Sequence, residues 1–350
     1  MFFSALQSSA VSVSPVSNKQ THVAVAARRA EACVTPPLNE LFRFALALGA
    51  VATIYAPTKS SAHGFEGDRF FPPTIQTDDP FATDELSFPT ISIFNNPAGE
   101  DGPKTREIGI SFEFSKEIFP KFALGISGGY TILNPKGASS VHGFDNLALS
   151  AKYQLLESPA HEFILSVGME WEIGGSGRQS LTENYSTLTP TIYFGKGFGD
   201  LPESLRMLRP LALTGTVGQG FPVRSLDSNV LEWGLSLQYN IPYLQQHVKD
   251  TGLPHPFRDM IPLVELSMET PENRDGGSST GTINPGVLWE GKSCQIGVEA
   301  TIPINRQTGP NIGMIFSVQI YIDDLFPKLF GHPLFGGSTG APASAPSYAK

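Results

Sequence analysis

Glutamate residues recur on one face of several segments of this sequence, and they are the side chains whose spacing could do chemistry. In each segment small or polar residues alternate with apolar ones, and a glutamate takes a polar position. Ten glutamates share this arrangement: Glu107, Glu113, Glu162, Glu170, Glu172, Glu232, Glu265, Glu269, Glu290 and Glu299. If the polar faces line one narrow channel, the carboxylates favour cations and repel anions. Two alternatives stay open: arginines of neighbouring strands pair with them, or water solvates them. Lys152 and Lys196 are the main cations expected on the same faces.

The sequence offers no pattern for catalysis or for metal binding. Five histidines fall in or beside expected turns, with no two at a metal-ligand spacing: His142, His161, His247, His255 and His332. Gly174-Gly-Ser-Gly177 lacks the spacing of a nucleophile elbow, and no helix follows the glycines of 195–199 to bind a phosphate. We therefore expect no enzyme, no catalytic residue, no metal and no cofactor.

Alternation with a period of two residues identifies the elements that position these glutamates. It is strongest at 107–115, 162–173, 231–241, 295–302 and 312–322. Weaker segments of the same kind lie near 88–95, 121–132, 145–156, 186–197, 207–218, 260–270 and 280–290. Turn residues separate the segments, and a short helix near 241–249 is the only helix expected. The sequence therefore predicts an all-β, antiparallel fold of about twelve strands.

A soluble sandwich or lipocalin-like barrel and a membrane barrel both show this alternation. Strand length favours the membrane barrel, because strands of about ten residues cross a hydrocarbon layer at a tilt, whereas soluble strands average about five or six. Only 16% of the residues are charged, which is low for a surface that faces water. We therefore predict an antiparallel transmembrane β-barrel. Its expected lipid-facing residues are Ile110, Phe112, Val167, Trp171, Trp233, Leu235, Phe316 and Val318.

The composition of the 350 residues excludes several other classes of protein. A mean hydropathy of −0.06 is too low for a protein with many membrane helices, each of which needs roughly 20 apolar residues. A formal net charge of −9 leaves no basic surface for nucleic acid. Cys33 and Cys294 are too few for a disulfide framework or a zinc site.

The N-terminal part of the chain has the features of a targeting segment. Residues 44–56 form an unbroken apolar run of 13 residues, which suits a signal-peptide core and follows Arg43. The small residues Ser60, Ser61 and Ala62 follow this run and suit a signal peptidase. We therefore place the cleavage after Ala62, so that the mature chain begins at His63. The alternative is a buried core helix. Residues 1–33 have the composition of a transit peptide or of an over-extended gene start, and we favour the second.

The mature chain divides into three parts. Residues 63–87 have no helical or strand period and carry acids and aromatics together, so we expect an ordered extended segment before the barrel. Asp78, Asp79, Asp84 and Glu85 match no calcium loop, which predicts that water solvates them. The barrel is expected over 88–326, with Phe326 closing its last strand. Residues 327–350 form a tail rich in Pro, Ala and Ser.

Residues 63–326, about three quarters of the chain, resemble a known family. The opening residues 64–72 and the segments 77–81 and 84–87, followed by Gly-rich amphipathic strands, are similar to exported outer-membrane barrels of the phenol-degradation MetA-pathway type. The resemblance implies a transporter of small hydrophobic or aromatic compounds. The tail after Phe326 departs from the family, whose barrels end at the last strand.

Together these observations predict a channel for passive passage of small molecules across a Gram-negative outer membrane, reached through a cleaved signal peptide. The expected partners are the lipid bilayer, a small-molecule cargo and the outer-membrane assembly machinery, with no nucleic acid. The alternative is a non-conducting structural or ligand-binding β-barrel, because about twelve strands enclose only a narrow interior.

Overall fold

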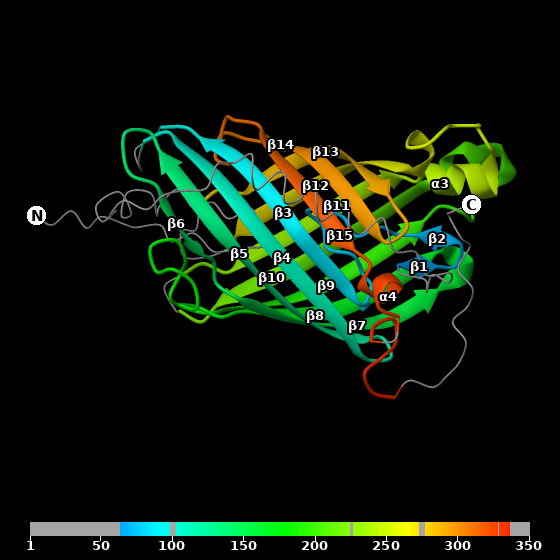
Figure 1. The fold of residues 1–350 in the computed structure, drawn as a ribbon, viewed down its shortest axis with the longest axis horizontal. Coiled ribbons are helices and arrows are strands. Elements are labelled where there is room, and N and C mark those ends of the chain that lie inside the picture. The colour runs from blue at the N-terminus through cyan, green and yellow to red at the C-terminus, as the bar shows by residue number, and fades with distance from the viewer. Residues whose placement is uncertain (1–63, 99–102, 225–226, 273–276, 328, 337–350) are drawn as a thin grey trace, which may run out of the picture.

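Twelve long strands form a closed antiparallel barrel in the computed structural model, which describes residues 64–98, 103–224, 227–272, 277–327 and 329–336 (Figure 1). Neighbouring strands follow one another along the chain, and pairing of the first strand with the last closes the barrel. The strands are β3 (Glu85–Asn96), β4 (Thr105–Phe119), β5 (Phe122–Pro135), β7 (Ala148–Ser158), β8 (Phe163–Glu172), β9 (Thr187–Gly197), β10 (Leu211–Pro222), β11 (Val230–Tyr239), β12 (Met260–Pro271), β13 (Thr280–Glu290), β14 (Cys294–Pro303) and β15 (Gly313–Ile320). The short strand β6 (Val141–Phe144) adds to β5 alone.

The predicted fold class is therefore confirmed, and each alternating segment becomes one strand of the barrel. Two boundaries differ. The first strand begins at Glu85 rather than at residue 88, and β15 ends at Ile320, so Phe326 does not close the last strand. The chain leaves the sheet there because the Tyr321 N–H donates to the carbonyl of Ser293 and a helical turn follows. The predicted N-terminal extension and signal peptide (residues 1–62), the expected first mature residue His63 and residues 337–350 of the tail lie outside the described residues.

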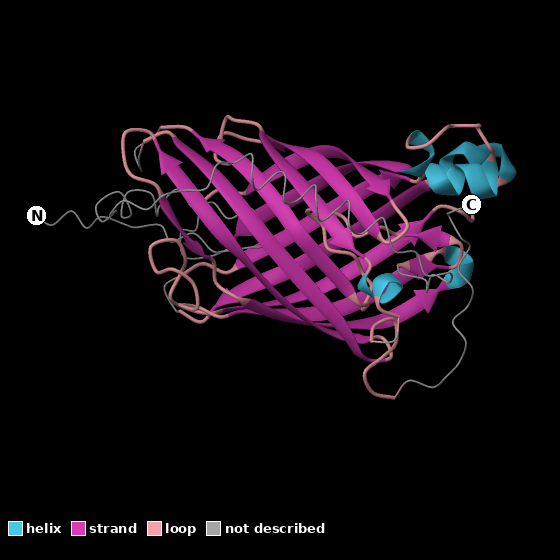
Figure 2. Ribbon diagram, viewed as in Figure 1, coloured by secondary structure: helices cyan, strands magenta, loops and turns pink. Residues whose placement is uncertain are grey.

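The two ends of the barrel differ in what they carry. The terminal end, where β3 begins and β15 ends, carries the helices η1 (Pro159–His161), η2 (Glu203–Leu208), α3 (Ile241–Tyr243), η3 (Leu244–Val248), η4 (Phe257–Asp259) and α4 (Ile322–Leu325) (Figure 2). Helices α3 and η3 occupy the segment predicted as a short helix. The loop end, where β3 ends, carries connections without helices in the described residues. Of the helices in the described part of the chain, none is long and apolar enough to cross a membrane.

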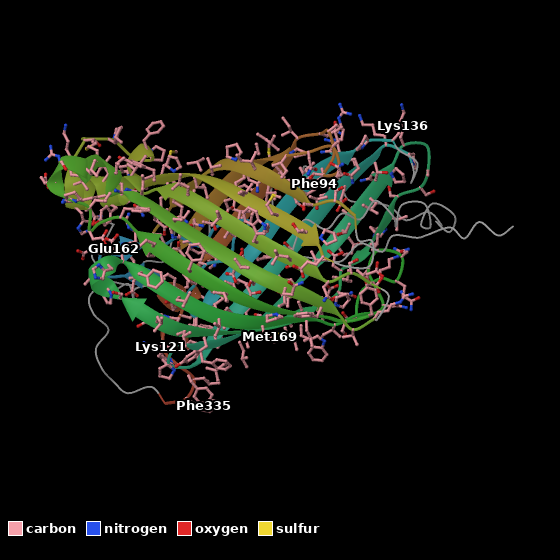
Figure 3. All side chains as sticks on the ribbon, turned by 180° about the vertical axis from the view of Figure 1, so that it is seen from behind. Phe94, Lys121, Lys136, Glu162, Met169 and Phe335 are labelled. Carbon is pink, nitrogen blue, oxygen red and sulfur yellow. The ribbon has the colours of Figure 1, made fainter. Side chains whose placement is uncertain are left out.

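The barrel is apolar outside and polar inside, which reverses the arrangement of a soluble globule. Strands β4, β5 and β7 to β15 each expose at least one large apolar side chain on the outer wall, among them Leu124, Val167, Met169, Ile192, Val217, Leu237, Val264, Ile283, Val298 and Met314. Met169 of β8 is labelled in Figure 3. The alternate positions point inward, and several polar side chains there are fully buried, including Ser166, Ser236, Gln238, Glu265, Asn284 and Glu299. Exposed apolar side chains on eleven adjacent strands form a continuous band, whereas monomeric soluble proteins rarely expose large contiguous apolar patches.

Before the first barrel strand the chain makes a small hairpin at the terminal end. Its strands β1 (Phe65–Glu66) and β2 (Arg69–Phe70) pair with each other and with no other strand of the described residues. The turn residue Gly67 has a φ of 63°, and a Cβ there would lie 2.4 Å from the carbonyl oxygen of Pro159. Only glycine therefore lets the hairpin seat against η1. Glu66 becomes buried by this docking, and burial, with a smaller contribution from the Glu157 carboxylate, raises its pKa to about 7.

This shift predicts that hairpin docking depends on pH. The docked Glu66 stays protonated up to its raised pKa of about 7, whereas the undocked residue ionises near its ordinary value of 4.5, so docking weakens as the pH rises from about 4.5 to about 7 and changes no further above that. Amide hydrogen exchange of residues 65–70, followed by mass spectrometry, should speed up between about pH 5 and 7 after correction for intrinsic exchange and level off above. Glu66→Gln should remove this extra dependence, and the same slope in that variant would contradict the assignment.

Candidate functional site

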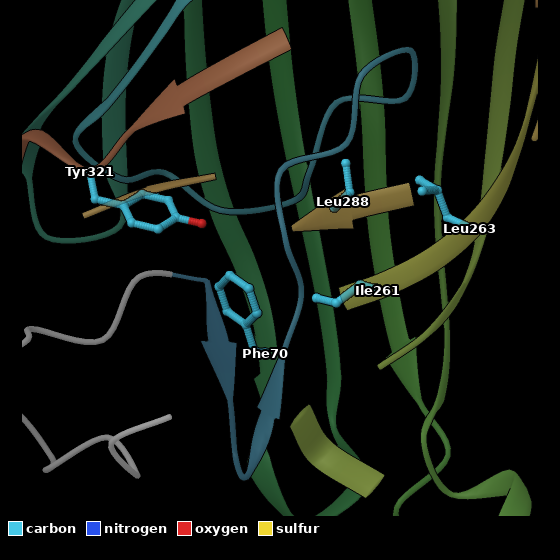
Figure 4. Close-up of a cluster of buried hydrophobic side chains, with 5 residues drawn as sticks. All are labelled: Phe70, Ile261, Leu263, Leu288 and Tyr321. Carbon is cyan, nitrogen blue, oxygen red and sulfur yellow. The ribbon is translucent and has the colours of Figure 1, made fainter. Parts of the chain in front are cut away.

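The segment of residues 64–84, called here the inserted segment, lies inside the barrel. Its aromatic residues hold it against the wall at two places. Phe71 and Phe81 pack with the inward-pointing Ile164 of β8 and Ala212 of β10. Phe70 packs with a second group, Ile261, Leu263, Leu288 and Tyr321, from β12, β13 and the residue after β15 (Figure 4). The lumen is therefore partly filled by the chain's own N-terminal residues.

A buried arginine fastens the inserted segment at the terminal end. The Arg69 side chain donates from Nε to Glu162 Oε2 at 3.1 Å, from Nη1 to the Pro210 carbonyl at 3.1 Å, and from Nη2 to the Arg209 carbonyl. Its guanidinium also lies 3.7 Å from the centre of the Tyr243 ring. Because each charge is paired and hydrogen-bonded, this buried ion pair avoids the cost of an unpaired charge.

Glu162 completes that anchor rather than lining an open lumen. It was predicted as the first polar position of a strand, but it lies in the turn before β8 with a φ of 46°. The carboxylate accepts from Arg69, from the Tyr243 hydroxyl at 3.0 Å and from the Gly199 N–H at 2.9 Å. The prediction that Glu162 lines an open channel is wrong, because these contacts bury it.

A single carboxylate holds the middle of the inserted segment. Glu265 of β12 accepts hydrogen bonds from three consecutive backbone N–H groups, with distances of 3.1 Å to Ile75, 2.8 Å to Gln76 and 2.9 Å to Thr77. Its side chain is completely buried. Hydrogen bonds to a charged acceptor are stronger than those to a neutral one. We therefore expect these three hydrogen bonds to hold the segment more strongly than its bonds to neutral side chains.

Other inward polar side chains partner the remaining backbone groups of the segment. Gln295 donates to the carbonyl of Pro73 at 2.7 Å, and Ser166 donates to the carbonyl of Pro80. Gln154 accepts from the Ala82 N–H at 2.9 Å. The polar inner face of the wall therefore serves in part as a set of hydrogen-bond partners for an extended chain.

Beside the inserted segment a cavity of about 260 Å³ remains. It runs from Glu85 and Gln319 near the terminal end to Leu181 and Glu183 at the loop end. The wall of this side is built from small residues, among them Ala123, Gly125, Ser127 and Gly129 of β5 and Ser150 of β7. A second cavity of about 80 Å³ lies toward the loop end, and Glu107 lines both.

The larger cavity is strongly acidic. Nine carboxylate side chains line it: Asp78, Asp79, Glu85, Glu107, Glu113, Asp145, Glu170, Glu172 and Glu183. Among the described residues that line it, Lys152 is the only cationic side chain. The Lys152 ammonium donates to Asp78 Oδ1 at 2.9 Å and to the Asp79 carbonyl at 2.8 Å.

The ten predicted glutamates separate into three groups. Glu107, Glu113, Glu170, Glu172 and Glu269 line the two cavities, and the charge of Glu232 acts together with that of Glu269, Glu170 and Glu172. Glu265 is buried under the inserted segment, Glu299 is buried beside Glu265, and Glu290 is half-buried beside Tyr321, which follows β15. Glu162 belongs to the anchor described above.

Sequence reasoning missed five carboxylates of the cavity and misplaced the charges of Asp79, Asp84 and Lys196. Asp78 and Asp79 come from the inserted segment, which has no period that could assign them a direction. Asp79 is buried, and so is Asp84, whose carboxylate accepts from Lys116 Nζ at 2.7 Å and from the Glu117 N–H at 2.6 Å. The prediction that water solvates these acids is therefore wrong. Lys196 does not face the lumen; it pairs with Asp200 of the following turn at 2.9 Å.

The predicted lipid-facing residues occupy the outward positions of their strands. Those on β15 are covered by the chain that follows this strand. Val167 and Trp171 are exposed. Ile110, Phe112, Trp233 and Leu235 are partly buried among their neighbours on the wall. Val318 is only 3% exposed, because Ile322, Leu325 and Phe330 of the chain after β15 fold back over it and over Phe316. The prediction that Val318 meets lipid is wrong for this reason.

Within the described residues no group of three or more His, Cys, Asp or Glu side chains is arranged to hold a metal ion.

Neither a protein-family model nor a curated protein matches the chain. Among solved structures, an outer membrane channel from Pseudomonas putida F1 is 12% identical, with a TM-score of 0.46 over 71% of this chain and 99% of that one. The NanC porin is 8% identical, with a TM-score of 0.42 over 66% and 98% of the two chains. The KdgM porin is 14% identical, with a TM-score of 0.37 over 66% and 98%. At such identities and scores the likenesses carry no functional argument.

The carboxylate of Glu265 is expected to control the exposure of the inserted backbone. Removing it in Glu265→Ala leaves three buried N–H groups without their acceptor, which costs roughly 1–3 kcal/mol for each charged hydrogen bond. Amide exchange of Ile75, Gln76 and Thr77 should then rise by at least about tenfold, measured by mass spectrometry on the folded protein. Glu203→Ala, an exposed change on η2, serves as the control. Unchanged exchange at 75–77 in Glu265→Ala would show that the segment is held elsewhere.

Proposed function

We propose that this protein is an outer-membrane channel for passive passage of small molecules, with a preference for cations. The observation that carries the proposal is the acidic cavity between the inserted segment and the small-residue wall of the barrel, with nine carboxylates and one ammonium. The proposal follows from the geometry of a closed barrel, whose lumen is the one route along its axis. The barrel needs no energy source for such passage.

The outer wall supports placement in a membrane. Apolar side chains are exposed on eleven strands that are adjacent around the barrel, β4, β5 and β7 to β15. Most strands have 10 to 15 residues, which is enough to cross the hydrocarbon layer at the tilt of a barrel. A closed barrel also satisfies its backbone groups within lipid. Export through a cleaved signal peptide after Ala62 and insertion by the assembly machinery belong to the same proposal.

The electrostatics of the lumen support the preference for cations. Carboxylates in a narrow cavity between low-dielectric walls produce a focused negative potential, which raises the local concentration of cations. The charges of Asp78, Asp79 and Glu170 all act on Glu113, so these groups share one field. The charge of Lys152 acts on Glu113 in the opposite sense.

The proposed cargo is small, because the free space is about 260 Å³. The sequence resemblance to barrels of the MetA-pathway type implies hydrophobic or aromatic compounds. Ile75, Phe81 and Tyr193 offer apolar surface in the same cavity. A cargo that combines a positive charge with an apolar body fits both features.

A non-conducting structural or ligand-binding barrel is the second candidate, and one observation favours it. On the side of β12 to β14 the inserted segment leaves side chains such as Glu265, Leu288 and Glu299 fully buried, so part of the lumen is closed. Current through single molecules in planar bilayers separates the two candidates. A folded protein that inserts and carries no current would support the filled barrel.

Removing charge from the cavity should reduce the preference for cations. Glu113→Gln with Glu170→Gln keeps side-chain volume and removes two carboxylates from the lining. We expect the ratio of potassium to chloride permeability, taken from reversal potentials under a salt gradient, to fall several-fold. Glu203→Gln, on the exposed helix η2, should leave the ratio unchanged. An equal permeability ratio in the double variant and the parent would show that these cavity carboxylates do not set the preference for cations.

Charge on the outer wall should prevent insertion. Val167 lies in the middle of β8 and is 37% exposed, and Leu253 in the loop between η3 and η4 is equally exposed at 37%. Arg at the midplane of a bilayer costs roughly 2–4 kcal/mol, so Val167→Arg should lower the fraction folded into vesicles, whereas Leu253→Arg should not. Heat-modifiable migration in gels measures that fraction. Equal yields for the two variants would argue against a membrane around β8.

A further inference from the structure

The ammonium group of Lys152 occupies a set of partners that would suit any primary amine. Lys152 reaches into the lumen from β7, and its Nζ lies 2.8 Å from Asp78 Oδ2 and 2.8 Å from the carbonyl oxygen of Asp79. The same Nζ lies 4.7 Å from the centre of the Tyr193 ring on β9. A carboxylate, a carbonyl and an aromatic face are the groups that bind a protonated amine. The protein thus holds one of its own ammonium groups in an amine-binding arrangement.

The arrangement opens onto free space rather than onto packed protein. Asp78, Asp79, Lys152 and Tyr193 all line the cavity of about 260 Å³. The Asp78 side chain is 44% exposed within this opening. Gly125 of β5 and Ser150 of β7 line the cavity in close contact, since a Cβ at Gly125 would lie 2.3 Å from Ser150 Oγ. A molecule in the cavity can therefore reach the partners of Lys152 without any shift of the wall.

The charge balance favours a second ammonium group in this space. Asp79, Glu85 and Glu113 line the cavity together with Asp78, and the charges of Asp78 and Asp79 act on both Glu85 and Glu113. The charge of Lys152 acts on Glu85 and Glu113 as well as on Asp78 and Asp79. Any added cation in the cavity relieves repulsion among these carboxylates.

The lining selects an organic cation over a bare metal ion. The described residues offer no cluster of His, Cys, Asp and Glu that would coordinate a metal. Ile75, Phe81 and Leu181 instead supply apolar surface close to the carboxylates. A primary ammonium on a short alkyl chain matches both, because its N–H groups bind the oxygens and its carbons cover the apolar residues.

We propose that the cavity binds small primary alkylammonium compounds, whose ammonium group exchanges with that of Lys152 at Asp78, the Asp79 carbonyl and the Tyr193 ring. A quaternary ammonium has no N–H group and would leave the Asp79 carbonyl without a donor, so it binds less well. This inference rests on the proposed function only in naming such compounds as cargo. Binding itself does not require that the barrel conducts.

The first experiment restores the missing amine. Lys152→Ala removes the atoms from Cγ to Nζ, and n-propylammonium supplies the same atoms in solution. We expect n-propylammonium to raise the Tm of the folded full chain of Lys152→Ala in detergent, in a dose-dependent manner, because a ligand that binds only the folded state stabilises it. Tetramethylammonium should not do so, and neither amine should raise the Tm of Lys152→Ala with Asp78→Asn.

The second experiment uses the parent protein, so that it does not depend on the folding of a variant. Calorimetric titration of 1,4-diaminobutane into the folded full chain should give saturable binding that weakens at least about tenfold in Asp78→Asn, the change expected for a lost charged hydrogen bond. In planar bilayers the same diamine should reduce the potassium current of the parent.

The outcomes separate this inference from the proposed function. A potassium current that 1,4-diaminobutane leaves unchanged, with no calorimetric binding and no effect of n-propylammonium on Lys152→Ala, overturns the amine site and leaves the channel standing. Amine binding without any current supports the site and overturns the channel. Tetramethylammonium acting as strongly as n-propylammonium would mean that charge alone attracts the ligand, which overturns the exchange with Lys152.

Discussion

An extended chain inside a closed barrel has no strand to pair with, and this constraint governs the interior of the protein. Backbone N–H and C=O groups that are buried away from water need hydrogen-bond partners. A group left without one costs free energy comparable to that of a lost hydrogen bond. The wall supplies those partners from its side chains. Glu265 accepts hydrogen bonds from three N–H groups. Gln295 and Ser166 donate to the carbonyls of Pro73 and Pro80, and Gln154 accepts from the N–H of Ala82. The polar character of the inner face is therefore a structural requirement as well as a property of the cavity.

The same constraint makes the two sides of the lumen different. Side chains that hold the segment must be long enough to reach it, as Glu265 and Gln295 are, and they close the space on the side of β12 to β14. The opposite side, formed by β4, β5 and β7, carries many Gly, Ser and Ala residues at the inward positions, besides Glu107 and Glu113, and leaves the cavity open. Lys152 of β7 crosses the space to reach Asp78. The acidic cavity thus follows from where the inserted segment lies.

The strands could be predicted from the sequence because their signal is local. Alternation along each strand states which residues share a face, and it correctly separates Val167 from Ser166. It does not state what covers that face. Glu113 and Glu265 have the same local pattern, yet one lines a cavity and the other binds backbone N–H groups, because only Glu265 lies opposite residues 75–77. Val318 is covered for the same kind of reason, by Phe330 after the last strand. Asp78 and Asp79 sit in a segment without a period, so no pattern could direct them into the lumen.

The order of elements along the chain explains why the segment is inside. Closure pairs β3 with β15, as in the contact of Ile91 with Phe316, and this is the pairing between the most distant strands in the sequence. Contacts of such separation form late, because the loop between them must be closed first. The inserted segment is joined directly to β3, and Asp84 at the junction is tied to Lys116 and to the N–H groups of Glu117 and Gly331. These contacts at Asp84 restrict the directions in which the inserted segment can leave β3. In the folded barrel its hydrogen bonds reach the inward residues Gln154, Ser166, Glu265 and Gln295, from β7, β8, β12 and β14, so that the segment and the wall are held together around the lumen.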